Sequence, residues 1–138
     1  MRRCFLSAAI GLLLAPWALA GAAPLGAADQ VIADQLTALA GGHARLAFSY
    51  AAPELRAQFK TAANFFRMVE KDYPAVIAPL SYSFGSPRSG TKGTVQPVDL
   101  LSRAGQLYRA LYLMQRQPDG SWRIGGVALR RVDLGPTV

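Results

Sequence analysis

The stretch from Leu107 to Leu129 constrains the fold of this chain more than any other. Two runs rich in strand-forming residues flank the turn Pro118-Asp119-Gly120, which predicts a β-hairpin. Proline cannot adopt the positive φ that a two-residue type I′ turn requires, so we predict a type I turn with glycine in the left-handed conformation. Gln117 then pairs with Ser121, and this pair sets the register of both strands.

Because side chains alternate along a strand, this register gives the hairpin two faces. We expect the aromatic face to point inward beneath the helices, and it carries Tyr108, Ala110, Tyr112, Met114, Trp122 and Ile124. The other face mixes leucine with arginine, as an outer face or a subunit interface does, and it carries Leu107, Arg109, Leu111, Leu113, Gln115, Arg123, Val127 and Leu129. Exposed apolar residues often mark an interface, so a homodimer through Leu111, Leu113 and Val127 is one arrangement we consider.

The first twenty residues have the pattern of a secretory signal peptide. Arg2 and Arg3 precede an apolar run, and Ala18-Leu19-Ala20 supplies a cleavage site. A membrane anchor is the alternative, but Pro16 interrupts a run shorter than the ~20 residues that a span needs. We therefore expect cleavage after Ala20 and a periplasmic or secreted protein without a membrane span. Because Arg2-Arg3-Cys4-Phe5-Leu6 resembles a twin-arginine export signal, the Sec and twin-arginine routes both stay open.

The composition of the mature chain excludes several kinds of site. Cleavage removes Cys4, the only cysteine, and with it any disulfide or thiolate chemistry. His43 is the only histidine and the acidic residues are scattered, so we expect no metal and no cofactor. Of 15 basic residues, 13 remain without Arg2 and Arg3, against 8 acidic ones. The basic residues are dispersed rather than clustered in a stripe, so we do not expect nucleic acid as a partner.

The mature chain changes character near Pro74. Before it, apolar spacing predicts helices over 29–40 and 44–50, a helical segment from Pro53, and a helix from the N-cap Thr61 to Asp72. After it, 80–84 and 94–102 are expected to form strands beside the hairpin, and Pro97 would place the second at a sheet edge or bulge.

Helices followed by strands predict an α+β domain, with N-terminal helices packed on a curved four-stranded antiparallel sheet. We assign residues 1–20 to the signal peptide, 21–27 to a mobile lead, 28–132 to this single domain and 133–138 to a tail.

A family resemblance rests on the order of several short stretches. Residues 41–48, 52–59 and 117–124 resemble the nuclear-transport-factor-2-like superfamily, also called SnoaL-like or cystatin-like. That resemblance implies a cone-shaped domain with one pocket. Within the superfamily, residues 47–53, Asn64-Phe65, Met68-Val69 and Ala110-Leu111-Tyr112-x-Met114 resemble the domain-of-unknown-function family DUF4864, a family of small exported bacterial domains. The resemblance covers about 28–129 and supplies no catalytic residues.

Asp99 is the one acidic residue that alternation would turn inward, opposite Tyr108. Enzymes of the superfamily use such a carboxylate as a general base beside a tyrosine, so Asp99 with Tyr108 or Tyr112 would indicate an isomerase or cyclase. We favour the alternative, in which Asp99 faces solvent or pairs with Arg109. The expected pocket residues are Tyr108, Tyr112, Met114, Trp122 and Phe65. Side chains such as Tyr112, Met114 and Trp122 are more often plain core than ligand contacts.

Taken together, the sequence favours an exported domain that binds a small apolar ligand or a protein partner without catalysis. The alternatives are an isomerase- or cyclase-type enzyme and a structural dimeric accessory protein of the cell envelope.

Overall fold

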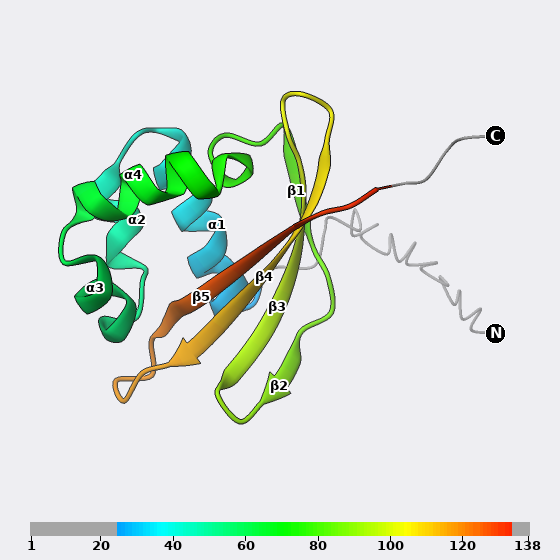
Figure 1. Ribbon diagram of the computed structural model, residues 1–138. Coiled ribbons are helices and arrows are strands. Elements are labelled where there is room, and N and C mark those ends of the chain that lie inside the picture. The colour runs from blue at the N-terminus through cyan, green and yellow to red at the C-terminus, as the bar shows by residue number, and fades with distance from the viewer. Residues whose placement is uncertain (1–24, 134–138) are drawn as a thin grey trace, which may run out of the picture.

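A computed structural model describes residues 25–133, so the expected signal peptide at 1–20 lies outside the described residues, as do 21–24 and 134–138. The described chain forms helices first and strands afterwards (Figure 1). The helices are α1 (Ala27–Ala40), α2 (Ala44–Ser49), α3 (Pro53–Phe59), α4 (Ala62–Asp72) and the short 3₁₀ helix η1 (Pro74–Val76). The strands are β1 (Ser81–Phe84), β2 (Arg88–Gly90), β3 (Gly93–Leu101), β4 (Leu107–Arg116) and β5 (Trp122–Arg131).

The four α-helices occupy the segments that local sequence signals predicted. Thr61 caps α4, because its hydroxyl accepts a hydrogen bond from the backbone N–H of Asn64 at 3.1 Å. Pro53 occupies the first turn of α3. His43 lies at the N-cap position of α2, where its side chain makes no capping bond. Within residues 25–133, no helix combines the length and the apolar character that crossing a bilayer requires.

The strands form one open antiparallel sheet in the order β1-β3-β4-β5, and β2 pairs with the same edge of β3 as β1 does. The helices lie together on one face of this sheet (Figure 1). The α+β class is confirmed, but the expected count of four strands is wrong for the described chain, which has five. β2 was missed because it is only three residues long and lies among glycines and Pro87.

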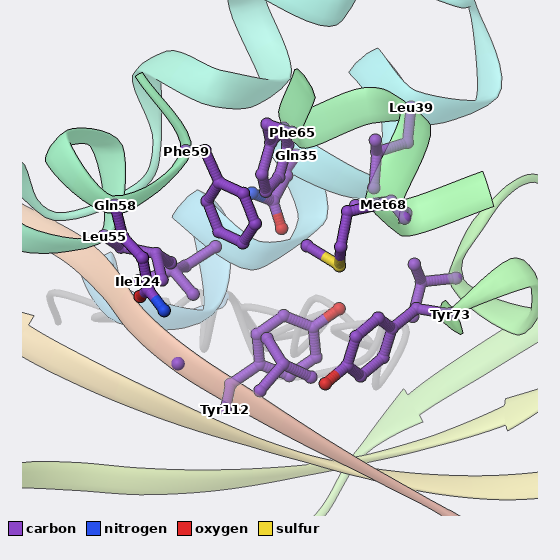
Figure 2. A pocket seen from close by; sticks show the side chains of 14 residues that line it. Gln35, Leu39, Leu55, Gln58, Phe59, Phe65, Met68, Tyr73, Tyr112 and Ile124 are labelled. Carbon is purple, nitrogen blue, oxygen red and sulfur yellow. The ribbon is translucent and has the colours of Figure 1, made fainter. Parts of the chain in front are cut away.

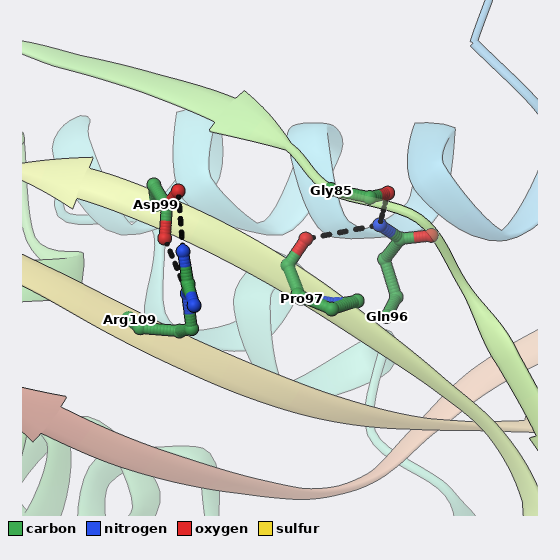
Figure 3. Close-up of polar contacts among 5 residues, drawn as sticks. All are labelled: Gly85, Gln96, Pro97, Asp99 and Arg109. Carbon is green, nitrogen blue, oxygen red and sulfur yellow. Dashed lines mark hydrogen bonds and ion pairs between the residues drawn. The ribbon is translucent and has the colours of Figure 1, made fainter.

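Of the two positions expected for Pro97, a sheet edge or a bulge, the edge is wrong, because β3 has a partner on each side. Pro97 lies at an irregularity: Phe84 pairs with Val98 but Arg88 with Val95, which leaves one extra residue on the strand opposite β3. The Gly85 N–H donates to the Pro97 carbonyl at 2.9 Å. In a regular antiparallel pair, residue 97 would donate in return to the Gly85 carbonyl, and proline has no N–H for this. The side-chain Nε2 of Gln96 donates to that carbonyl instead, at 2.7 Å (Figure 3). A neighbouring amide thus replaces the missing backbone donor at the break between β1 and β2.

The hairpin turn has the predicted form. Gln117 donates to the Ser121 carbonyl at 2.7 Å, and Gly120 adopts a φ of 85°. Arg116 lies opposite Trp122 and Met114 opposite Ile124, as expected.

Beyond Ile124 the predicted register of β5 is wrong. A β-bulge shifts the pairing by one residue, so that Tyr112 lies opposite Val127 rather than Gly126. Ala110 then lies opposite Leu129 rather than Ala128. Val127 and Leu129 therefore share the inward face of Tyr112, since a one-residue shift exchanges the two faces of a strand. The outward face keeps Leu111 and Leu113 but loses Val127.

The register between β3 and β4 also differs by one residue from the expectation. Asp99 lies opposite Arg109, and Leu100 takes the position opposite Tyr108. The buried residues of β3 are Gln96, Val98 and Leu100, so Asp99 points to the outward face.

Candidate functional site

A cavity of about 250 Å³ lies between the helices and the inward face of the sheet (Figure 2). Apolar side chains make up most of its wall. It is lined by Gln35, Leu39, Leu55, Gln58, Phe59, Phe65, Met68, Val69, Tyr73, Val76, Tyr112, Ile124, Gly126 and Val127.

Helical and strand periodicity explain which side chains reach this cavity. On α4, Phe65, Met68 and Val69 are spaced three and four residues apart and therefore share one helix face. On the sheet, Tyr112 and its register partner Val127 point to the same side. Phe65 is held by two aromatic neighbours, with ring centroids 5.4 Å from Phe48 and 5.7 Å from Phe59.

Gln35 brings an oriented polar group to the apolar wall. Its side chain is 4% exposed, and Nε2 donates to the Ala47 carbonyl at 3.1 Å. Because a carbonyl can only accept, this bond fixes which end of the amide is which. The oxygen Oε1 therefore points away from Ala47, into the cavity (Figure 2). Among the described residues no hydrogen bond reaches Oε1.

Tyr112 supplies the second polar group, from the sheet side. The residue is 1% exposed, yet within residues 25–133 no hydrogen bond reaches its hydroxyl. Every fully buried side-chain oxygen or nitrogen in the described part of the chain has a hydrogen-bond partner. Because the hydroxyl of Tyr112 has none, it is not fully buried and must border the cavity. Figure 2 shows it pointing toward the cavity centre. Burial, helped by the phenol of Tyr82, raises the pKa of Tyr112, so the hydroxyl stays neutral at physiological pH.

Among residues 25–133, none that lines the cavity contributes a carboxylate, imidazole, ammonium or guanidinium group. General acid–base chemistry at neutral pH relies mostly on His, Asp, Glu or Lys side chains within reach of the substrate. The lining also offers no anionic ligand to a metal, and over residues 25–133 no three His, Cys, Asp or Glu side chains come together.

The structure brings two of the expected pocket residues, Phe65 and Tyr112, to the cavity, and the other three lie elsewhere. Met114 faces inward but is fully buried in the core. Trp122 lies at the hairpin end, where the Arg116 guanidinium carbon is 6.0 Å from its ring centroid. Tyr108 lines a separate hollow together with Pro74, Ile77 and Arg103 among others.

Asp99, the candidate base, lies on the outward face of the sheet. Arg109 donates to its carboxylate through Nε at 2.8 Å and through Nη2 at 3.1 Å (Figure 3). These hydrogen bonds lower the pKa of Asp99, which is opposite to what a general base at neutral pH needs. The favoured expectation, in which Asp99 faces solvent or pairs with Arg109, describes this arrangement, and the less favoured inward placement is not present. The isomerase or cyclase hypothesis loses its base.

Twelve of the fourteen lining residues were not among the predicted pocket residues, and Gln35 and Val127 are the two on which the proposals below depend. Gln35 had a usable signal, because it interrupts the apolar stripe of Ile32, Leu36 and Leu39 on α1. Val127 had a weaker one, since Gly125-Gly126 allows a bulge without requiring it.

Comparison with known proteins identifies a family. No curated protein and no solved structure matches the chain significantly. The sequence profile of the family described as "Domain of unknown function (DUF4864)" matches residues 26–135, which covers every helix and strand described above. The chain therefore belongs to the DUF4864 family.

Proposed function

We propose that this chain is an exported binding domain that holds a small, largely apolar ligand in the cavity beneath its helices, without catalysing a reaction. One observation carries the proposal: two buried polar groups point into an apolar cavity that no charged side chain of the described segment lines. Binding pockets commonly combine apolar walls with a few placed polar groups.

The size of the cavity favours a ligand of about one ring with a short substituent. Its 250 Å³ exceeds the ~150 Å³ at which an apolar protein cavity already accepts benzene. It lies near the lower end of ligand pockets, which start at about 300 Å³.

Helix α3 offers a route of entry. Its residues Leu55, Gln58 and Phe59 line the cavity, yet no residue of this helix is fully buried. Elements with few buried contacts open at low free-energy cost, so a small displacement of α3 would admit a ligand.

The proposal includes export and superfamily placement. Export is supported by the signal-peptide pattern of Arg2, Arg3, the apolar run that follows them, and Ala18-Leu19-Ala20. Membership of the nuclear-transport-factor-2-like superfamily, with its cone shape, is supported by helices that precede the sheet and cover one face over a pocket. A homodimer stays a prediction, now through Leu111 and Leu113 alone.

The test uses toluene as probe and a matched pair of variants. In ¹⁵N-correlation spectra, toluene should shift amides of α4, β4 and β5 around the cavity. Val127→Phe places a ring into the cavity and should abolish those shifts. Val95→Phe, on the outward face opposite Leu113, should leave them intact. Identical shifts in Val127→Phe, or a wild type in which neither toluene nor benzyl alcohol shifts these amides, would overturn the proposal.

A further inference from the structure

The two polar groups of the cavity wall approach it from opposite layers. Gln35 belongs to α1 and Tyr112 to the middle of β4, and both side chains are more than nine-tenths buried. In Figure 2 the amide oxygen of Gln35 and the hydroxyl of Tyr112 both point into the space between the layers. Neither atom is sealed, so both can bond to whatever fills the cavity, and a ligand that displaces water from them must replace the hydrogen bonds that water makes there.

Each group imposes one requirement on the ligand. Gln35 presents the acceptor Oε1 to the cavity (Figure 2), because Nε2 is turned toward the Ala47 carbonyl, to which it donates one of its two N–H bonds. The ligand must therefore donate a hydrogen bond to Oε1. The hydroxyl of Tyr112 stays protonated and can donate or accept; because the ligand's proton goes to Oε1 of Gln35, the ligand's oxygen can accept from Tyr112. A hydroxyl group meets both requirements with a single atom.

The same geometry rejects anions. A carboxylate has no proton to donate to Oε1 of Gln35, and its charge would enter an apolar wall without a cation. Burying an unpaired charge is far more costly than burying a neutral hydroxyl. The other polar lining residues, Gln58 and Tyr73, are only partly buried or exposed, so they impose no comparable requirement.

We infer, building on the proposed function, that the ligand is a neutral alcohol or phenol on a small apolar skeleton. Its hydroxyl donates to Oε1 of Gln35 and accepts from the hydroxyl of Tyr112, while its carbon skeleton packs among Phe65, Val69 and Val127.

The test compares benzyl alcohol, toluene and benzoate, which share one ring and differ in the polar group. Dissociation constants are measured by NMR titration of the full-length protein, its Tyr112→Phe variant and its Tyr108→Phe variant. Tyr108→Phe deletes the same hydroxyl from a residue outside the cavity and serves as the matched control.

We expect Tyr112→Phe to raise the dissociation constant of benzyl alcohol about fivefold, which corresponds to the loss of one net hydrogen bond, and to leave that of toluene unchanged. Tyr108→Phe should change neither affinity, and benzoate should not bind in the cavity.

Two kinds of failure are distinguishable. If toluene binds but Tyr112→Phe leaves the affinity for benzyl alcohol unchanged, or if benzoate binds as tightly as the alcohol, the inferred ligand class is wrong and the binding function stands. If neither toluene nor benzyl alcohol binds in the cavity, the proposed function itself fails and the inference fails with it.

Discussion

Replacing Tyr112 with Phe should stabilise the ligand-free protein slightly, which is unusual for a buried tyrosine. A buried hydroxyl normally makes a hydrogen bond, and losing that bond costs about 1 kcal/mol. Tyr112 is 1% exposed, and within the described chain its hydroxyl makes no hydrogen bond. An unpartnered buried hydroxyl costs about 1–3 kcal/mol in proteins. Water in the cavity offsets part of this cost, so we expect a gain of up to about 1 kcal/mol.

The effect of Tyr112→Phe should grow at alkaline pH. Burial raises the pKa of Tyr112 in the folded state above the unfolded value of about 10. The folded state therefore holds this proton more tightly than the unfolded state does. The corresponding stability is fully present below about pH 10 and is lost as the pH rises further. The variant has no phenol at this position. Its free energy of unfolding should therefore fall less than that of the wild type between pH 9 and pH 11, which is about one unit either side of the unfolded pKa.

Urea denaturation followed by circular dichroism measures both effects, at neutral pH and across the alkaline range. The parallel variant Tyr108→Phe controls for the loss of one phenol. A loss of more than about 1 kcal/mol at neutral pH in Tyr112→Phe would mean that the hydroxyl has a partner in the protein. The free hydroxyl in the cavity, on which the ligand inference rests, would then be refuted.

Three further predictions concern the sheet. Gln96→Leu should lower the free energy of unfolding by about 1 kcal/mol, because the Gly85 carbonyl loses its donor. Adding Pro97→Val restores a backbone N–H and should cancel most of that loss. Strictly additive effects in a double-mutant cycle measured by urea denaturation would contradict the role assigned to the amide. Asp99→Asn should leave the dissociation constants of toluene and benzyl alcohol, measured by NMR, unchanged, because Asp99 lies on the outward face. A clear loss of affinity would mean that the carboxylate contributes to the binding site. Leu111→Glu with Leu113→Glu should convert a dimer to monomers in analytical ultracentrifugation, whereas a monomeric wild type would refute the dimer.

The helices and the hairpin turn were predictable because their signals are local. The N-cap Thr61, the proline in the first turn of α3 and the Pro118-Asp119-Gly120 turn each act within a few residues. The loop before β4 contained a comparable signal that sequence reasoning did not use. Ser102 donates to the Gln106 carbonyl and Gly105 adopts a φ of 81°, so this loop repeats the hairpin turn with glycine in the same place. Applying that form would have placed Asp99 opposite Arg109.

The remaining errors arise from tertiary context. Whether Gly125-Gly126 forms a bulge depends on the strand that it pairs with, and this decides whether Val127 faces the cavity or solvent. Pro97 fits an interior strand only because Gln96 supplies a donor from its side chain. Neither arrangement has a signature in residue spacing. The cavity itself depends on how closely three helices approach the sheet, which no local pattern specifies.

A crystal structure of the protein with benzyl alcohol bound tests the central claim most directly. The account predicts a ring among Phe65, Val69 and Val127, with its hydroxyl oxygen within about 3 Å of both Oε1 of Gln35 and the hydroxyl of Tyr112. A cavity closed by protein side chains, or an alcohol found only outside it, would contradict the account.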